Sequence, residues 1–432
     1  MANLLTRFLP TISFRAKAPK SLMPANQFSG FPLQNWFSGF AKSGEQVSEK
    51  NVKQLAVYYA CIRNIAEDIS KLPYIVVKTE KNGNKSRVSN LNVAKILQVK
   101  PNSYSTPIGL KYSIINDAIA RGNGYALIIR DKAGLATEMH YIDSNFVFPE
   151  FDIDTKSMFY QINYTPLGLS GIYSSEDIFH IKGPGNSMVG QSVLAFQLET
   201  LGHALAIQNY SSKYFSGGAS MSGILTFEGV NDEKKLRQYT EMFMASYTGG
   251  SIAAMPSGVK FEAMGNDPQK SQFVETENYM RGEIARWFRM PLSKLQDLSD
   301  TNNSALEQVN INYVTDCLMP WIVRFEQEAD QKLYAIYERD IYDGYIDTDM
   351  LLRGDSAAME RKVRTMFTSG AITPNEVRKM YAINTIDEDY ANSSYMPSNM
   401  MPGETAIPFW TAQSEKNQQL TNSQPGMGGA QQ

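Results

Sequence analysis

The segment from Pro268 to Trp321 restricts the fold of this 432-residue chain more than any other part of it. A helical pattern opens with acidic residues and closes with basic ones, which matches the signs of the helix dipole. Its charged residues are Glu275, Glu277, Arg281, Glu283, Arg286 and Arg289. Pro291 then stops the helix, and a second helical pattern follows a polar connector. The segment therefore predicts a mechanical arrangement of two helices and a loop, without a catalytic group.

The connector, QDLSDTNN, contains two aspartates, no lysine or arginine, and several side chains that favour turns over helix. We expect an exposed, mobile, acidic loop formed by Gln296, Asp297, Leu298, Ser299, Asp300, Thr301, Asn302 and Asn303. Asn303 or Ser304 can cap the next helix, with Glu307 as the partner in a capping box. That helix would extend to about Tyr334 with a kink at Pro320. On pattern alone, a buried helical hairpin in a globular core is the ordinary explanation.

Composition places the chain among ordinary soluble proteins of two to four domains, with 43% hydrophobic residues to build a core. Lysine and arginine total 41 against 44 aspartate and glutamate, and the net charge of −3 argues against a broad basic face that grips nucleic acid. Cys61 and Cys317 lie in apolar helical patterns and are expected to be buried thiols in a reducing compartment. Neither a disulfide nor a thiolate metal site is expected.

The two ends of the chain are expected to carry little regular structure. Residues 1–45 mix aromatic residues with glycine and serine, and Pro10 breaks the apolar run that a signal peptide would need. Residues 396–432 form a disordered tail, rich in Gln, Asn, Gly and Ser towards its end. No window approaches the roughly 20 apolar residues of a membrane span. We therefore expect a soluble protein that folds inside the cell.

Between these ends the pattern predicts an α+β domain with a mostly antiparallel sheet. A helical stripe from Val52 to Pro73 precedes a strand pair joined by an Asn82-Gly83 turn. The remaining predictions are a helix at about 92–97, a helix from Thr106, strands from Tyr125 to about Gly183, a helix at 192–215, a β-α-β insert at 220–264 with strands at 223–227, 251–255 and 259–264, and short helices at 347–390, one of them capped by Thr373.

No combination of residues in the sequence forms a credible active site or metal site. His140, His180 and His203 lack partners at ligand spacing and are expected to be structural. The glycine-rich stretch Gly183–Gly190 fails the dinucleotide fingerprint and lacks a P-loop lysine, so loop geometry explains it better. No nucleophile elbow accompanies the serines. We therefore predict a protein that is not an enzyme and that uses no cofactor or metal.

The order of these features resembles the portal proteins of tailed bacteriophages, HK97 type, from about Val52 to Tyr390. The most specific element is EIARWFRMP followed by NNSALEQ and LMPW. Supporting motifs are KLPYIV (71–76), KPNSYST (100–106), RGNGYALIIRD (121–131), DIFHIKG (177–183), LLRGD (351–355) and GAITPNEVR (370–378). Two departures concern Arg289-Met290, where a smaller apolar pair is common, and residues 387–394, which lack a glycine-rich turn.

The resemblance implies a ring, usually a dodecamer, at one capsid vertex, through which double-stranded DNA is packaged and later ejected. It assigns 1–45 to an N-terminal arm, 46–190 to an α+β wing, 191–217 and 266–295 to two stem helices, 218–265 to a clip, 296–303 to a tunnel loop, 304–345 to a long kinked helix, 346–395 to a helical crown and 396–432 to the tail. Implied partners are further copies of the chain, the terminase large subunit, head-tail adaptors, the major capsid protein and scaffold, without a membrane. The implied location is the virion, and the host cytoplasm during assembly.

An acidic and polar loop suits such a channel, because each phosphate that lysine or arginine neutralises would add salt-dependent affinity and hence friction. Two alternatives stay open. The chain could be another ring-forming connector or structural protein of the capsid. It could also be a nucleotide-dependent enzyme that uses the Gly183–Gly190 loop.

Overall fold

The computed structural model consists of two compact units, residues 1–351 and 352–432, which are described separately below. The structure describes residues 22–24, 38–80, 85–186, 188–216, 223–227, 232–248, 259–263, 270–295, 303–348, 351, 356–381, 383–395, 411–412, 414 and 416. Within these residues, no helix has the length and apolar character needed to cross a bilayer.

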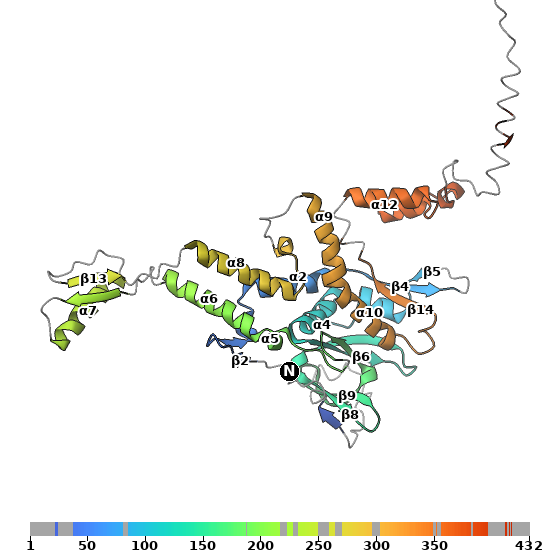
Figure 1. Cartoon of the computed structure of the whole chain (residues 1–432). Coiled ribbons are helices and arrows are strands. Elements are labelled where there is room, and N and C mark those ends of the chain that lie inside the picture. The colour runs from blue at the N-terminus through green and yellow to red at the C-terminus, as the bar shows by residue number, and fades with distance from the viewer. Residues whose placement is uncertain are drawn as a thin grey trace, which may run out of the picture. The chain divides into compact units, whose positions relative to one another are not determined.

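Three antiparallel sheets and two central helices form the body of the first unit (Figure 1). The helices are α2 (Ala56–Ser70) and α4 (Pro107–Arg121). One sheet has the order β14-β4-β5 (Tyr342–Ile346, Tyr74–Thr79, Lys85–Val88) and another β11-β6-β7 (Ile178–Lys182, Asn123–Arg130, Ala136–Ile142). The third has the order β1-β8-β9-β10 (Leu22–Pro24, Val147–Asp152, Ser157–Tyr164, Leu169–Ser174). The predicted α+β class is confirmed, although three small sheets replace a single sheet.

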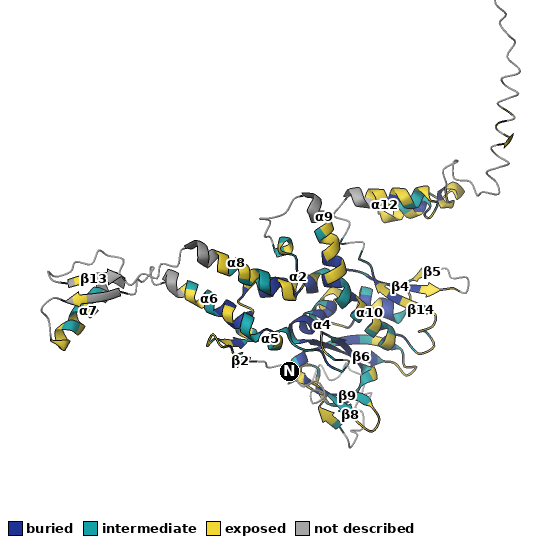
Figure 2. Cartoon of the chain, in the orientation of Figure 1, coloured by how far each residue is buried: buried dark blue, intermediate teal, exposed yellow. Residues whose placement is uncertain are grey.

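Local sequence signals explain where the two central helices begin and end. Thr106 caps α4 through a hydrogen bond from the Gly109 amide, and Pro107 occupies the first turn. The left-handed Gly122 (φ +85°) ends the helix. The stripe of α2 that the sequence predicts is buried, and the buried residues concentrate around α2, α4 and β6 (Figure 2).

The predicted arm, residues 1–45, contains two described strands, β1 and β2 (Ser38–Phe40). Strand β1 pairs with β8, and β2 pairs with β3 (Gln46–Ser48). Helix α1 (Glu49–Val52) follows β3 directly. The remaining short elements of this unit are α3 (Asn92–Ala94), a π-helical segment at Lys95–Val99 and 3-10 turns at Ser144–Phe146, Thr165–Leu167 and Ser175–Asp177.

Helix α10 (Met319–Lys332) covers the outer edges of two sheets with its charged side chains. On β14, the Ile346 amide donates to Glu326 Oε1 at 2.7 Å. On β11, the His180 amide donates to Glu328 Oε1 at 2.9 Å, and Lys332 Nζ donates to the Ile178 carbonyl. One helix therefore satisfies three of the backbone groups at these two sheet edges.

Most of the remaining elements of the first unit follow β11 and precede α10 in the sequence. They are α5 (Val193–Phe196), α6 (Leu198–Ser216), β12 (Gly223–Phe227), α7 (Glu233–Thr248), β13 (Val259–Ala263), α8 (Lys270–Trp287), a 3-10 turn at Leu292–Leu295 and α9 (Asn303–Asn312). Strand β12 pairs with β13 in antiparallel fashion around α7. The strand predicted at 251–255 lies outside the described residues.

One prediction about a continuous helix is wrong. The helix expected from Ser192 to Phe215 is divided at Gln197, which leaves the helical conformation (φ −107°, ψ 19°) between α5 and α6. The long helix predicted to extend to about Tyr334 ends close to that position, since α10 stops at Lys332. Residues 342–346, at the end of the block 304–345, form the strand β14 against β4, which the sequence did not predict.

The second unit contains α12 (Ser356–Thr368) and α13 (Pro374–Met380). From Glu360 to Thr368 the residues of α12 are exposed or half-buried, apart from Val363. Thr373 and Glu376 form a full capping box at the start of α13, as the sequence indicates. Asn375 is 5% exposed and bonds the backbone of Ile386 through both ends of its amide, which fixes the chain after α13. A 3-10 turn at Asp389–Asn392 closes this unit.

Candidate functional site

Helix α8 carries the charged residues that the sequence singles out, except Arg289, which follows it, and the helix lies beside α6 (Figure 1). Ile284, Ala285 and Phe288 are buried in the core. The charged residues Glu275, Glu277, Arg281, Glu283, Arg286 and Arg289 all occupy exposed or half-buried positions. Arg281 pairs with Glu277 at 2.8 Å, and Arg286 pairs with Glu283. Such exposed pairs contribute about 0.3–0.5 kcal/mol each, so this side of α8 is shaped for solvent or a partner.

The C-terminus of α8 has the hydrogen bonds of a Schellman motif, but with arginine where glycine is usual. The Met290 amide donates to the Ala285 carbonyl at 3.0 Å, and the Arg289 amide donates to the Arg286 carbonyl at 3.1 Å. Arg289 takes the left-handed position with φ +53°. This conformation costs a residue with a Cβ about 1 kcal/mol. Pro291 then prevents continuation, as predicted.

The long helix behind α8 is irregular before Pro320, where the sequence predicts a kink. Residues Asn303–Asn312 are α-helical, Tyr313–Leu318 form a π-helical segment, and α10 begins at Met319. Pro320 lies in the first turn of α10 and cannot donate to Asp316, four residues earlier. The Asp316 carbonyl instead accepts from Arg289 Nη1 at 3.4 Å. The distortion is therefore spread over the π-helical segment and is coupled to the end of α8.

Two hydrogen bonds attach the π-helical segment to its neighbours. Tyr313 donates its hydroxyl to Asp68 Oδ2 on α2 at 2.8 Å, and burial raises the pKa of Tyr313. Cys317 Sγ donates to the Phe288 carbonyl at the end of α8 at 3.0 Å. Burial raises the pKa of the Cys317 thiol to about 12, so it acts as a neutral hydrogen-bond donor.

The predicted loop between these helices lies mainly outside the described residues. Gln296, Asp297, Leu298, Ser299, Asp300, Thr301 and Asn302 belong to that part, and Asn303 is the first residue of α9. The position and charge of the loop therefore remain predictions. Its two flanking helices are the parts that the structure describes.

The glycine-rich stretch 183–190 is a structural loop whose amides are used internally. Asn186 Oδ1 accepts from the Met188 and Val189 amides, and the Gly190 amide donates to Asn123 Oδ1 at 2.8 Å. A Cβ at Gly190 would overlap the carbonyl of Gly122, which explains the need for glycine. These amides are not directed at a phosphate, which favours the loop explanation over a nucleotide site.

The histidines fit the structural roles predicted for them. His180 is buried between Tyr160, 2.9 Å from Nδ1, and Asn123, 2.9 Å from Nε2, and burial lowers its pKa well below the usual value. His140 contacts Tyr104 and Glu138, and His203 is exposed on α6. Among the described residues, no group of three or more His, Cys, Asp or Glu side chains could hold a metal ion.

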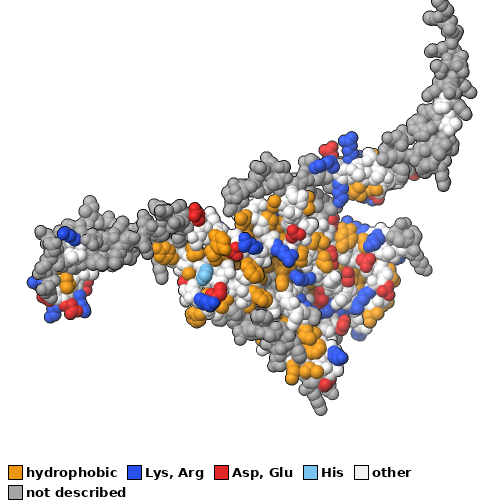
Figure 3. All heavy atoms as spheres, viewed as in Figure 1, with side chains coloured by type: hydrophobic (Ala, Val, Ile, Leu, Met, Phe, Trp, Pro, Cys, Tyr) orange, Lys and Arg blue, Asp and Glu red, His pale blue; other side chains and the backbone are white. Residues whose placement is uncertain are grey.

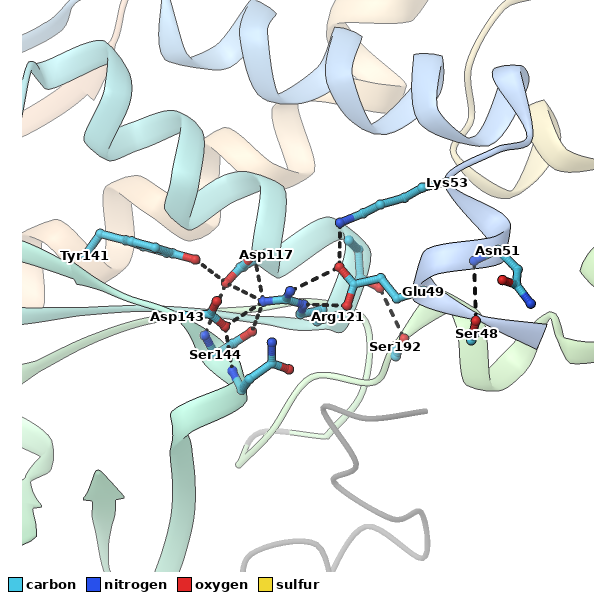
Figure 4. A network of polar contacts seen from close by, with 12 residues as sticks. Ser48, Glu49, Asn51, Lys53, Asp117, Arg121, Tyr141, Asp143, Ser144 and Ser192 are labelled. Carbon is cyan, nitrogen blue, oxygen red and sulfur yellow. Dashed lines mark hydrogen bonds and ion pairs between the residues drawn. The ribbon is translucent and has the colours of Figure 1, made fainter. Parts of the chain in front are cut away.

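A polar network around Arg121, which the sequence did not reveal, joins α1, α4 and the end of β7 (Figure 4). Arg121 is 13% exposed and contacts Glu49 at 3.0 Å, Asp117 at 3.2 Å and Asp143 at 2.8 Å. Tyr141 also donates its hydroxyl to Asp117 at 2.8 Å. Among the ion pairs of Arg121, only the one with Asp117 has helical spacing. Glu49 and Asp143 lie too far from Arg121 in the sequence for a local pattern to indicate their contacts with it.

Burial and the charge of Arg121 shift the pKa values of these carboxylates in opposite directions. Burial raises the pKa of Asp117, and attraction to Arg121 offsets only part of this rise. At Glu49 burial acts in the same upward direction, but hydrogen bonds from Lys53 and Arg121 outweigh it and lower the pKa. The network therefore anchors α1, and the adjoining β3 that packs on α6, to the core.

Comparison with known proteins agrees with this architecture. A family model described as "Phage portal protein" matches residues 56–381. The portal protein of Enterobacteria phage HK97 is 27% identical over 342 residues, covering 77% of this chain and 80% of the relative. The probable portal protein of Streptomyces phage phiC31 is 26% identical over 317 residues, covering 68% and 67%.

Solved structures show the same fold at lower identity. An HK97 family phage portal protein from Corynebacterium diphtheriae superposes with a TM-score of 0.53 at 14% identity, covering 73% of this chain and 98% of that one. A chain from the virion of a native gene transfer agent particle gives 0.52 at 18% identity, covering 76% and 90%. Because the family model spans most of its length, the chain belongs to the phage portal protein family.

Proposed function

We propose that this portal protein assembles into a closed ring at one vertex of the capsid, through which double-stranded DNA is packaged and later ejected. The observation that carries the proposal is the family match over residues 56–381, which includes α8, the connector and the long helix. Portal proteins are structural, and we expect no catalytic activity. The terminase would supply the work of packaging.

The assignment of parts within the ring follows the order of elements. Helices α6 and α8, which lie side by side, would form the stem, and the β12-α7-β13 insert between them would form the clip for terminase and head-tail adaptors. Residues 46–190 would form the wing and 346–395 the crown. The major capsid protein and scaffold would surround the ring in the virion, after assembly in the host cytoplasm.

The surface charge supports a channel that does not hold DNA tightly. On the face drawn in Figure 3, the described lysine and arginine side chains are interspersed with hydrophobic and acidic ones and form no continuous basic band. The net charge of −3 also argues against tight binding of DNA. Few phosphate contacts give weak, non-specific affinity, which allows a duplex to slide.

Electron microscopy of the purified full-length protein tests the ring directly. We expect closed rings with a central hole and a mass in solution that is a multiple of the 48.4 kDa chain. A protein that stays monomeric at micromolar concentration in low salt would contradict the proposal.

Charge reversal tests the predicted tunnel loop. We expect Asp297→Lys with Asp300→Lys to leave rings intact and to slow DNA packaging in a terminase-driven assay, because new cations would bind phosphates. Asp297→Asn with Asp300→Asn is the control and should package normally. Normal packaging by the lysine variant would show that the loop charge does not meet the DNA.

A further inference from the structure

A hollow of about 500 Å³ lies where the end of α8 meets the π-helical segment and the start of α10. Apolar residues of the core, including Ile65 and Ile119, contribute to its lining. Trp287, Trp321, Arg289 and Arg324 also line it, and we call it the arginine–tryptophan hollow. Tryptophan and arginine are the residue types most enriched at the energetic centres of protein interfaces.

The positive charge in the hollow exceeds the negative charge that the chain supplies there. Arg286, Arg289 and Arg324 line it together with two carboxylates, Glu283 and Asp316. Glu283 is paired with Arg286. Within the described part of the chain, neither Arg289 nor Arg324 forms an ion pair with a carboxylate. Arg324 instead lies over the Trp321 ring at 5.0 Å, a position that holds the guanidinium ready for a partner.

The two unpaired arginines also repel one another. Burial and, beyond it, the positive charge of Arg289 lower the pKa of Arg324. An anion between them would relieve this repulsion. The three arginines of the lining, Arg286, Arg289 and Arg324, outnumber its two carboxylates, Glu283 and Asp316, so the site favours one further negatively charged group.

Backbone strain at Arg289 is an independent observation. The residue holds φ +53° at a helix end where glycine would fit without strain. Trp287, two residues earlier, is 52% exposed although it is large and apolar. Strained residues and exposed aromatic side chains both concentrate at functional surfaces.

We propose that the arginine–tryptophan hollow receives a carboxylate-bearing segment of a second copy of this chain. The inference rests on the ring of the proposed function, because a ring that closes by rotation joins two unlike patches of the same molecule. The chain carries exposed carboxylates, among them Asp340 and Glu388, so a second copy has negatively charged groups to offer. A duplex suits the hollow less well, because a recess with two indoles and an apolar lining favours side chains over backbone phosphates.

The test removes the cations without disturbing the fold. Arg289→Gly keeps the left-handed backbone and relieves its strain, and Arg324→Ala removes the second charge. The double variant, as full-length protein, is compared with wild type by native mass spectrometry across a salt series. The control is Arg63→Ala with Arg87→Ala, which removes two exposed arginines from α2 and β5.

We expect the double variant to form rings about tenfold more weakly than wild type, with the loss greatest at low salt, while its thermal melting as a monomer is unchanged or higher. The control pair should assemble as wild type does. Equal weakening in both pairs would refute the inference, since it would reflect total charge alone.

The other outcomes are also decisive. If wild type never forms rings, the proposed function fails, and the inference fails with it. If the double variant assembles normally, the inference is wrong and the proposed function stands. If its rings form normally but bind DNA less well than wild-type rings, the arginines serve the nucleic acid, and the inference is likewise wrong.

Discussion

Removing the cation at the centre of the Arg121 network should be among the most damaging single changes in the first unit. In Arg121→Met, three carboxylates keep their positions without their common partner; Glu49, Asp117 and Asp143 have side chains 25%, 5% and 30% exposed. Removing one partner from a buried charge network costs about 3–5 kcal/mol. Methionine retains the length of the side chain, so the loss reflects charge more than volume.

Urea denaturation at pH 7, followed by tryptophan fluorescence, measures this loss. The matched control is Lys53→Met, which removes a 46% exposed lysine from the same Glu49 carboxylate and should cost less than about 1 kcal/mol. A loss below about 1 kcal/mol in Arg121→Met would refute the reasoning, because it would mean that water reaches the carboxylates.

The pH dependence gives the same prediction a second readout. In wild type the pKa of Glu49 is lowered on folding, so its contribution is present above its unfolded pKa and is lost as the pH falls. Without Arg121 the effect of burial on Glu49 and Asp117, which raises their pKa, is offset less, so acid relieves the cost of burying their charges. The gap between variant and wild type should therefore narrow as the pH falls from 7 to about 4. A constant gap would show that packing, not charge, causes the loss.

Two further predictions concern a glycine and a carboxylate. Gly190→Ala should destabilise the protein by more than about 2 kcal/mol, because the new Cβ would overlap the Gly122 carbonyl. The control is Gly134→Ala, at φ +82° with open space around the new Cβ, which should cost about 1 kcal/mol. Urea titration measures both losses, and equal losses would contradict the predicted overlap. Burial raises the pKa of Asp330 to about 6, so ionisation disfavours the folded state and stability should fall as the pH rises from about 4 to about 6. Asp330→Asn should flatten this fall in a melting-temperature series, whereas the exposed Asp340→Asn should leave the fall unchanged. An unchanged slope in Asp330→Asn would contradict the assignment.

Elements with a local signal are predictable from the sequence, and the structure confirms them. Thr373 caps the helix that it is predicted to cap, and Thr106 caps the helix that is predicted to begin there. A hydroxyl three residues before a free amide is a short-range contact, so the local sequence can indicate it. Gln197 carries no such signal, and the break between α5 and α6 was missed. The strand β14 was missed because Asp343 and Gly344 interrupt a short strand that only pairing with β4 stabilises.

In the candidate site, too, some features are predictable from the sequence and others are not. The charged residues of α8 could be located from helix periodicity, and the irregularity near Pro320 from the missing amide. The left-handed Arg289 could not, because arginine gives no hint of a position that glycine normally fills. The Arg121 network could not either, because Glu49 and Asp143 reach the arginine only after the chain has folded.

The way α10 closes two sheets has a consequence for any protein that collects in many copies. An uncovered edge strand can form backbone hydrogen bonds with any other strand, so copies at high local concentration would aggregate through their sheet edges. Glu326 and Glu328 each occupy one outward amide, that of Ile346 on β14 and that of His180 on β11, so a foreign strand cannot use those two positions. Copies are left to meet through side chains, which carry the specificity that backbone pairing lacks.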